Sequence, residues 1–143
     1  MQHILGKTTM TTFHPYRSLF DAGVVVNGGS DHMVKSDATE SINPYNPFLA
    51  MWSIITRTTE RGSHIVPGEA ISREEALRMY TINNACASFE ENIKGSLEAG
   101  KLADLAVISE DILRCAADSI KNIHSDLTIL GGKIVYSSGR IVP

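Results

Sequence analysis

A hydroxyl, a carboxyl and an imidazole side chain follow one short apolar run near the start of the chain. Ser30, Asp31 and His32 come directly after Val24–Val26 and Gly28-Gly29. Three consecutive valines bounded by glycines predict a buried strand of a parallel sheet, because such strands are apolar on both faces. Binding and catalytic groups collect at the carboxyl ends of strands in these sheets. This position would suit a functional carboxylate.

The same residues also have a purely structural interpretation. An Asp after Gly-Ser often caps the next element or forms an Asx-turn, and the local chemistry of Asp31 taken by itself favours that turn. The glycines before Asp31 leave room for the backbone to pass close to a ligand or to a neighbouring strand. Both interpretations of Asp31 remain open at this point.

Length, charge and hydropathy are those of an ordinary globular domain. The chain has 143 residues, of which 43% are hydrophobic and 20% charged. A net charge of −3 without a basic cluster argues against nucleic acid as a partner. No apolar run approaches the roughly 20 residues that span a bilayer, and no signal peptide is evident, so we expect no membrane partner and a cytoplasmic location. Cys86 and Cys115 lack CxxC spacing, and Cys86 is expected to be a small buried hydrophobe.

The first two thirds of the chain predict helices around the Val24–Val26 strand. Pro15–Ala22 is typical of a short helix that begins at a proline and stops before Gly23. Residues 33–47 predict a loop, and apolar residues at helical spacing then predict a helix from Phe48 to Gly62. Within that helix, Trp52 is expected to lie in the core.

A capped helical pair follows, and the last third changes to strands. Ser72 and Glu75 match a capping box, and residues 72–89 predict two helices, the second capped by Thr81, that form no site of their own. Leu105–Ile108 reads as a strand, and residues 127–136 as a hairpin with a two-glycine turn. These strands predict a small mixed or antiparallel sheet. We place the boundary between two portions of the chain at residues 94 and 95.

Three stretches together resemble a known family. They are Gly29-Ser30-Asp31-His32, the helical stretch ISREEAL with its continuation YTINNA, and GSLEAGKLADLAVI at residues 95–108. In this order and at this spacing they are similar to the C-terminal part of the metal-dependent amidohydrolase superfamily, in the branch related to N-substituted formamide deformylases. The GSLEAGKLADLAVI stretch is highly specific to the superfamily. The likeness covers residues 15–136.

The resemblance implies a fold, a reaction and a role for Asp31. The fold class is α/β: residues 1–94 would supply the last strand and helices of a (β/α)₈ TIM barrel, and residues 95–143 part of a small β-sandwich. Asp31 would ligate or face a divalent metal, with zinc the expected ion, and would accept and return the proton of the attacking water. Ser30 and His32 are candidates for supporting positions beside it. The substrate of the parent enzyme would be a small-molecule amide.

The sequence also departs from the family pattern. A barrel of this kind needs about 250 residues, and the five histidines include no His-x-His pair. A catalytic zinc normally has three protein ligands, so one aspartate cannot hold it tightly. We therefore expect the chain on its own to show negligible metal-dependent amide hydrolysis.

Two functional hypotheses follow. The first is a C-terminal segment of a hydrolase acting on carbon–nitrogen bonds other than peptide bonds. The second is a non-catalytic assembly or binding module that self-associates or is completed by another chain. If this chain is the whole polypeptide, apolar surface around Val24–Val26 and around the helix with Leu49 and Trp52 would be exposed, so we expect a homo-oligomer.

Overall fold

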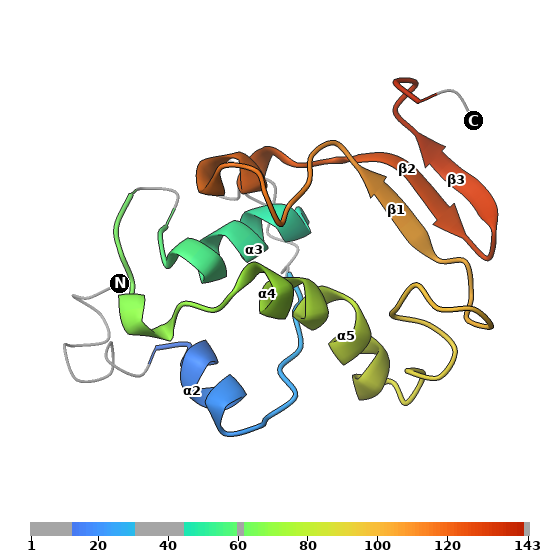
Figure 1. Cartoon of the computed structure of the whole chain (residues 1–143). Coiled ribbons are helices and arrows are strands. Elements are labelled where there is room, and N and C mark those ends of the chain that lie inside the picture. Colours follow the sequence, from blue (N-terminus) through green and yellow to red (C-terminus); the bar gives the residue numbers. More distant parts are fainter. Residues whose placement is uncertain (1–12, 31–44, 60–61, 142–143) are drawn as a thin grey trace, which may run out of the picture.

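The computed structural model describes residues 13–30, 45–59 and 62–141. The helices lie together in one part of the molecule, and a three-stranded sheet extends away from them (Figure 1). In chain order the elements are α2 (Tyr16–Asp21), α3 (Pro47–Thr56), η1 (Pro67–Glu69), α4 (Arg73–Tyr80), α5 (Ile82–Ala87), β1 (Leu105–Ile108), η2 (Ala117–Asn122), β2 (Ser125–Leu130) and β3 (Lys133–Ser137).

Helix α3 begins where the sequence predicts and ends earlier. The Asn46 side chain accepts the Phe48 backbone N–H at 2.9 Å, so it satisfies one of the free amides of the first turn. The predicted continuation to Gly62 is wrong, because Arg57 adopts a left-handed φ of 52° and ends the helix. The chain then turns back, and Thr58 forms an antiparallel bridge with the exposed His64.

The capping box of α4 is confirmed. The Ser72 hydroxyl accepts the Glu75 N–H at 3.1 Å, and the Glu75 carboxylate accepts the Ser72 N–H at 2.8 Å. The predicted cap of α5 is wrong: the Thr81 hydroxyl donates to the Leu77 carbonyl of α4 at 2.7 Å instead. Thr81 therefore joins α5 to the end of α4.

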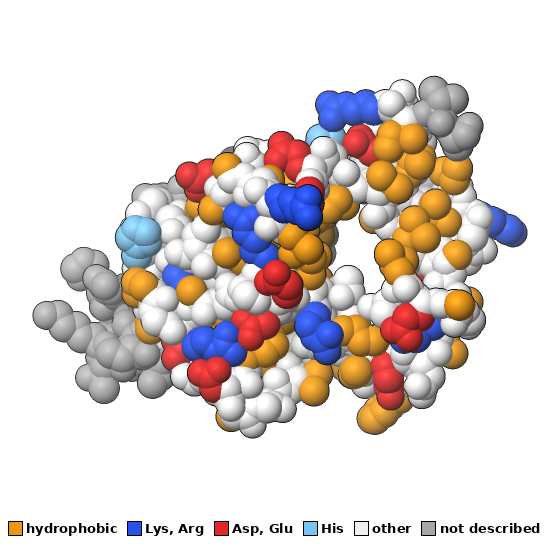
Figure 2. Space-filling view, viewed as in Figure 1, with side chains coloured by type: hydrophobic (Ala, Val, Ile, Leu, Met, Phe, Trp, Pro, Cys, Tyr) orange, Lys and Arg blue, Asp and Glu red, His pale blue; other side chains and the backbone are white. Residues whose placement is uncertain are grey.

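The predicted sheet is confirmed as antiparallel, in the order β1-β2-β3. Leu105 pairs with Ile129, and Leu130 pairs with Lys133 across the hairpin. The turn glycines have φ values of 55° and 77°, as a primed hairpin turn requires. Every residue of β3 is exposed, and Figure 2 shows apolar side chains gathered on the sheet beside an opening toward the helices.

The core lies between α3, α4 and the segment around η2. Trp52 is only 3% exposed, because η2 covers it: its indole Nε1 donates to Asp118 Oδ1 at 3.2 Å, and the Lys121 ammonium lies 4.5 Å from the ring centroid. Trp52 is thus a core residue as predicted, and the expectation of exposed apolar surface around it is wrong. The buried apolar cluster consists of Met51, Trp52, Ile54, Ile71, Ala76, Met79, Ile112, Ile120 and Ile123.

The predicted buried strand at Val24–Val26 is not formed in this structure. The segment belongs to no sheet, and Val24 and Val25 are 45% and 59% exposed. The helix before it agrees with the prediction, since α2 is followed at once by Gly23 with a φ of 74°. The valine run has no neighbouring strand within the described ranges, so Val24 and Val25 are exposed, whereas Val26 packs against the buried cluster.

Candidate functional site

The segment that leads to Ser30 runs along helices α4 and α5. The Val26 carbonyl accepts a hydrogen bond from Asn83 Nδ2 at 2.8 Å, and the Gly28 carbonyl accepts one from Asn84 Nδ2 at 3.0 Å. The Gly28 N–H donates to the Met79 carbonyl at 2.9 Å. Two side chains from α5 and one backbone carbonyl from α4 therefore hold residues 26–28 against the helices.

Gly28 fits this position because it has no side chain. A Cβ built at Gly28 would lie 2.4 Å from Cε2 of Tyr80, closer than carbon atoms can approach. The Tyr80 hydroxyl donates to the Gly29 carbonyl at 3.5 Å. Burial raises the pKa of the Tyr80 phenol, and neighbouring Tyr16 adds to this rise, so the group stays protonated. The sequence indicated that glycine here permits a close approach, and the neighbour is an aromatic ring.

The two asparagines match the geometry of an extended chain. Alternate carbonyls of such a chain point to the same side, and consecutive Asn83 and Asn84 bind the carbonyls of residues 26 and 28. Backbone groups of Val25 and Asn27 form no hydrogen bonds to other described residues. One edge of the segment is therefore bound by the helices, and the opposite edge has no hydrogen-bond partner among the described residues.

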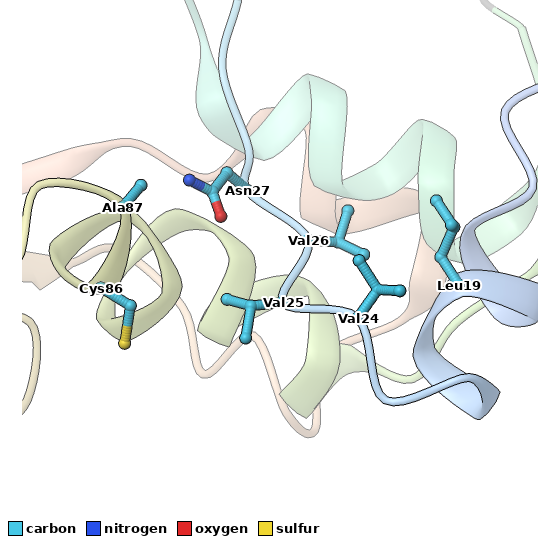
Figure 3. A pocket seen from close by; sticks show the side chains of 7 residues that line it. All are labelled: Leu19, Val24, Val25, Val26, Asn27, Cys86 and Ala87. Atoms are coloured by element: carbon cyan, nitrogen blue, oxygen red, sulfur yellow. The ribbon is translucent and has the colours of Figure 1, made fainter.

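An apolar groove lies beside the open part of the segment (Figure 3). It has a volume of about 560 Å³. Cys86, for which the sequence predicts a small buried hydrophobe, contributes to this lining and is only half-buried. The lining residues are Leu19, Val24, Val25, Val26, Asn27, Cys86 and Ala87.

The predicted site residues are only in part described. Ser30 is exposed and forms no hydrogen bond with other described residues. Asp31 and His32 lie outside the described residues, as does most of the predicted loop at 33–47. The structure therefore describes the backbone that precedes Asp31, as far as Ser30.

The described residues do not fit a metal centre among themselves. No group of three or more His, Cys, Asp or Glu side chains within residues 13–30, 45–59 and 62–141 could hold an ion. His14 stacks on Tyr16 with 5.6 Å between ring centroids, and burial, with Arg57 adding to it, lowers its pKa. His64 Nδ1 lies 3.2 Å from the Thr58 hydroxyl. Both imidazoles are thus explained by local contacts.

A buried arginine joins the end of α3 to two other segments. Arg57 is 4% exposed, and its guanidinium donates to the carbonyls of Ile65 and Val66 at 2.8 and 3.3 Å and of Phe13 at 2.9 Å. Its Cζ lies 5.5 Å from the Tyr16 ring centroid. Burial lowers the pKa of Arg57. It forms no ion pair with other described residues, so carbonyl dipoles and the aromatic face stabilise the charge.

The sequence prediction missed the contribution of the helical pair to this region. The prediction that residues 72–89 form no site of their own omits three contacts, because Tyr80, Asn83 and Asn84 all contact residues 26–29. A signal was present, because asparagine competes with the helix backbone for hydrogen bonds and is unfavourable inside a helix. Two consecutive asparagines in α5 therefore indicate that their side chains form hydrogen bonds with residues outside this helix.

None of the helices within the described ranges is both long and apolar enough to cross a membrane.

Comparison with known proteins gives consistent results. The family model described as "Amidohydrolase family" matches residues 1–136. The chain is 39% identical over 122 residues to the N-substituted formamide deformylase of Arthrobacter pascens, which covers 85% of this chain and 21% of that protein. It is 29% identical over 124 residues to Protein LONG AFTER FAR-RED 3 of Arabidopsis thaliana, covering 85% of this chain and 19% of that protein.

The chain is also similar to an imidazolonepropionase. The chain is 28% identical over 130 residues to the imidazolonepropionase of Porphyromonas gingivalis, covering 88% of this chain and 26% of that protein. The chain thus spans about a fifth to a quarter of the length of these curated relatives. The similarity predicted from the three sequence stretches is confirmed, and the chain belongs to the amidohydrolase family.

Proposed function

We propose that this chain is the C-terminal part of a metal-dependent hydrolase that cleaves a carbon–nitrogen bond of a small-molecule amide. Family membership implies a (β/α)₈ barrel as the parent fold. The similarity to a protein named N-substituted formamide deformylase supports an amide as the substrate class. The observation that carries the proposal is the family match over residues 1–136, which includes Asp31 and the segment before it.

The change from helices to strands along the chain supports a division into two structural portions. Residues 1–94 would belong to the barrel, whose described part here is helical up to α5. Residues 95–143 would belong to the small β-sandwich and contain all three strands that the structure describes. The exposed β3 is consistent with a sheet that has further strands to pack against.

Asp31 would move the proton during hydrolysis. Water adds through its oxygen to the amide carbon, and the carboxylate accepts the proton that this water loses. The carbon–nitrogen bond then breaks, and the carboxyl group returns the proton to the leaving nitrogen. The products are a carboxylic acid and an amine, so all atoms are balanced. Ser30 and His32 adjoin this carboxylate in sequence and would support it.

A divalent metal belongs to the proposal, with zinc the expected ion. Amidohydrolases are generally metal-dependent, and a bound metal supplies Lewis-acid polarisation of the reacting groups. Asp31 would be one ligand. Because the described residues offer no ligand cluster, the remaining ligands would come from other parts of a longer chain or from another chain.

A second candidate is a non-catalytic module that self-associates or is completed by another chain. The observation that favours it is exposed apolar surface in two places: Val24 and Val25 beside the groove, and β3, where Ile134 and Val135 are 46% and 58% exposed. Surfaces of this kind invite association. Both candidates therefore include a homo-oligomer or larger assembly, which light scattering across a dilution series would detect as a mass above that of one chain.

A chimera with the Arthrobacter pascens deformylase tests the enzymatic proposal. The aligned C-terminal region of that protein is replaced by this chain, and hydrolysis of an N-substituted formamide is measured. We expect an active chimera, and Asp31→Asn should lower kcat by roughly 10²-fold or more. Glu110→Gln, at an exposed carboxyl, is the matched control and should leave kcat unchanged.

Equal activity of the Asp31→Asn and Glu110→Gln chimeras would overturn the role of Asp31. The 143-residue chain by itself should give no turnover with or without added zinc. Turnover by the chain alone, with one zinc bound and lost in Asp31→Asn, would contradict the expected dependence on other ligands.

A further inference from the structure

We propose that the pocket beside Arg57 binds a small carboxylate that carries an apolar group. The pocket has a volume of about 270 Å³ and lies between α3, the segment that leads into α2 and the segment near Ile65. Its defining feature is a buried positive charge that has no counter-ion among the described residues and keeps a free hydrogen-bond donor. Neither the pocket nor its ligand depends on the proposed role of Asp31.

The positive charge of Arg57 is buried without an opposite charge in contact with it. The residue is 4% exposed and forms no ion pair with other described residues. Burial lowers the pKa of Arg57, and Tyr16 and Glu69 oppose this shift only in part. Both Glu69 carboxylate oxygens accept hydrogen bonds from Ser18, from its backbone N–H at 2.9 Å and from its hydroxyl at 2.6 Å. Because a buried charge without a counter-ion is costly, an anion in the pocket would be strongly attracted to this guanidinium.

One arm of the Arg57 guanidinium has no hydrogen-bond partner. Nε donates to the carbonyls of Ile65 and Val66, and Nη2 donates to that of Phe13, whereas Nη1 forms no hydrogen bond with other described residues. Nη1 is not sealed in the core, because within the described ranges the sole fully buried side-chain nitrogen or oxygen without a partner belongs to Glu91. Since Arg57 lines the pocket, Nη1 is a donor open to a ligand there, and guanidinium groups form strong hydrogen bonds with carboxylates.

The other titratable side chains that line the pocket add no further charge. Burial lowers the pKa of His14, and Arg57 adds to this shift, so the imidazole is neutral at pH 7. Burial raises the pKa of Tyr16, so its phenol stays protonated. One positive charge matches one carboxylate, whereas a dianion such as sulfate would retain an excess negative charge in a largely apolar pocket. The charge of the pocket therefore favours a monoanion.

The wall of the pocket favours a ligand with an apolar group. Apolar side chains come from Phe13, Ala50, Ile54 and Ile65. The volume lies just below the roughly 300–1,000 Å³ of sites that bind drug-sized ligands, so the ligand should be a smaller molecule. A carboxylate attached to one aromatic ring combines these properties, and benzoate is therefore a suitable probe.

Titration of the 143-residue chain with benzoate at pH 7 tests the proposal. The reporter is the NMR signal of the Arg57 Nε–H, which we expect to shift in a saturable manner. Benzamide has the same shape without the charge, and sulfate has charge without an apolar group. Both should bind at least about tenfold more weakly than benzoate, because neither combines a charge-assisted hydrogen bond with apolar contacts. Absence of a saturable shift with benzoate, or equal affinity for either of the other two compounds, would overturn the proposal.

Two variants locate the bound benzoate. Ala50 is half-buried on α3 and lines the pocket, so Ala50→Leu should fill the pocket without removing any Arg57 hydrogen bond and should weaken benzoate binding at least about tenfold. Ala87→Leu is the matched change, at the separate groove beside Val24–Val26, and should leave the affinity unchanged.

Unchanged binding in Ala50→Leu, or equal weakening in both variants, would show that benzoate binds elsewhere and would overturn the proposal. The comparison of benzoate with benzamide and sulfate needs no variant, so it decides the question even if Ala50→Leu does not fold.

Discussion

Arg17 of α2 and Glu75 of α4 form an ion pair with 2.8 Å between Nη1 and Oε2, and the same carboxylate oxygen accepts the Ser72 N–H that closes the capping box. One side chain thus starts a helix and joins it to another. Helix α2 leads directly into residues 24–30, so this pair also anchors the beginning of the candidate site.

The stability of the chain should depend on pH through Glu75. The hydrogen bond from Arg17 is the main cause that holds the pKa of Glu75 below its usual value, with a further contribution from Ser72. A carboxyl with a lowered pKa in the folded state stabilises the fold above its unfolded pKa of about 4.3, and this contribution is lost as the pH falls through the folded pKa. Glu75→Gln should therefore flatten the acid limb of a stability profile measured by urea unfolding.

At pH 7 the free energy of unfolding of the same Glu75→Gln variant should fall by roughly 0.2–1 kcal/mol, the range of a partly exposed ion pair. Glu74→Gln is the matched control, because Glu74 is exposed in the same helical turn. A steep acid limb that persists in Glu75→Gln and disappears in Glu74→Gln would contradict the assignment.

Truncation of Ile120 should strongly destabilise the chain. Ile120 is fully buried in the cluster that η2 forms with α3, and replacing a buried isoleucine by alanine costs about 2–5 kcal/mol. Ile134→Ala, at a residue 46% exposed on β3, should cost much less. Denaturant unfolding followed by the fluorescence of Trp52, the single tryptophan, measures both. Similar losses for the two variants would show that η2 does not complete the core.

The hairpin turn allows a test of backbone conformation alone. Gly131 has a φ of 55°, and a Cβ there would meet no atom within 4 Å, so only the left-handed backbone opposes substitution. Gly131→Ala should cost about 1 kcal/mol or more, whereas Gly131→Asn should cost less because asparagine tolerates this conformation. In thermal unfolding, the midpoint temperature should be highest for the parent chain with Gly131, lower for Gly131→Asn and lowest for Gly131→Ala. An alanine variant as stable as the parent would contradict the turn geometry.

Arg57 should not be replaceable by lysine. Its planar guanidinium donates to carbonyls of Phe13, Ile65 and Val66 in different directions, which one ammonium group cannot reproduce. Arg57→Lys keeps the positive charge but loses the planar donor group. The free energy of unfolding of this variant should fall by about 1–3 kcal/mol. Arg114→Lys is the control, because the Arg114 side chain is 88% exposed. Urea unfolding measures both, and equal stability of the two variants would contradict the assigned role of the three carbonyl contacts.

Local signals predicted local structure well. The capping box at Ser72 and the hairpin at Gly131-Gly132 depend on residues a few positions apart, and both formed as expected. The end of α3 escaped prediction because a left-handed Arg57 is stabilised by carbonyls of residues 13, 65 and 66, which no local pattern reveals.

The candidate site was predictable only in part. The valine run indicated an extended segment before Asp31, but its exposure depends on which strands lie beside it, and Val24 and Val25 have none within the described ranges. Asn83 and Asn84 were missed because their partners are more than fifty residues away. The same local sequence can join two helices or bind a distant segment of backbone, and only the tertiary contact distinguishes these two roles.

The contact between Gly28 and Tyr80 makes these two positions genetically interdependent. A methyl group at position 28 would collide with the ring, so a library that varies position 28 with tyrosine retained should return glycine almost exclusively. Varying both positions together should recover alanine at 28 in combination with a smaller residue at 80, a case of epistasis between a strand-like segment and the helix packed against it.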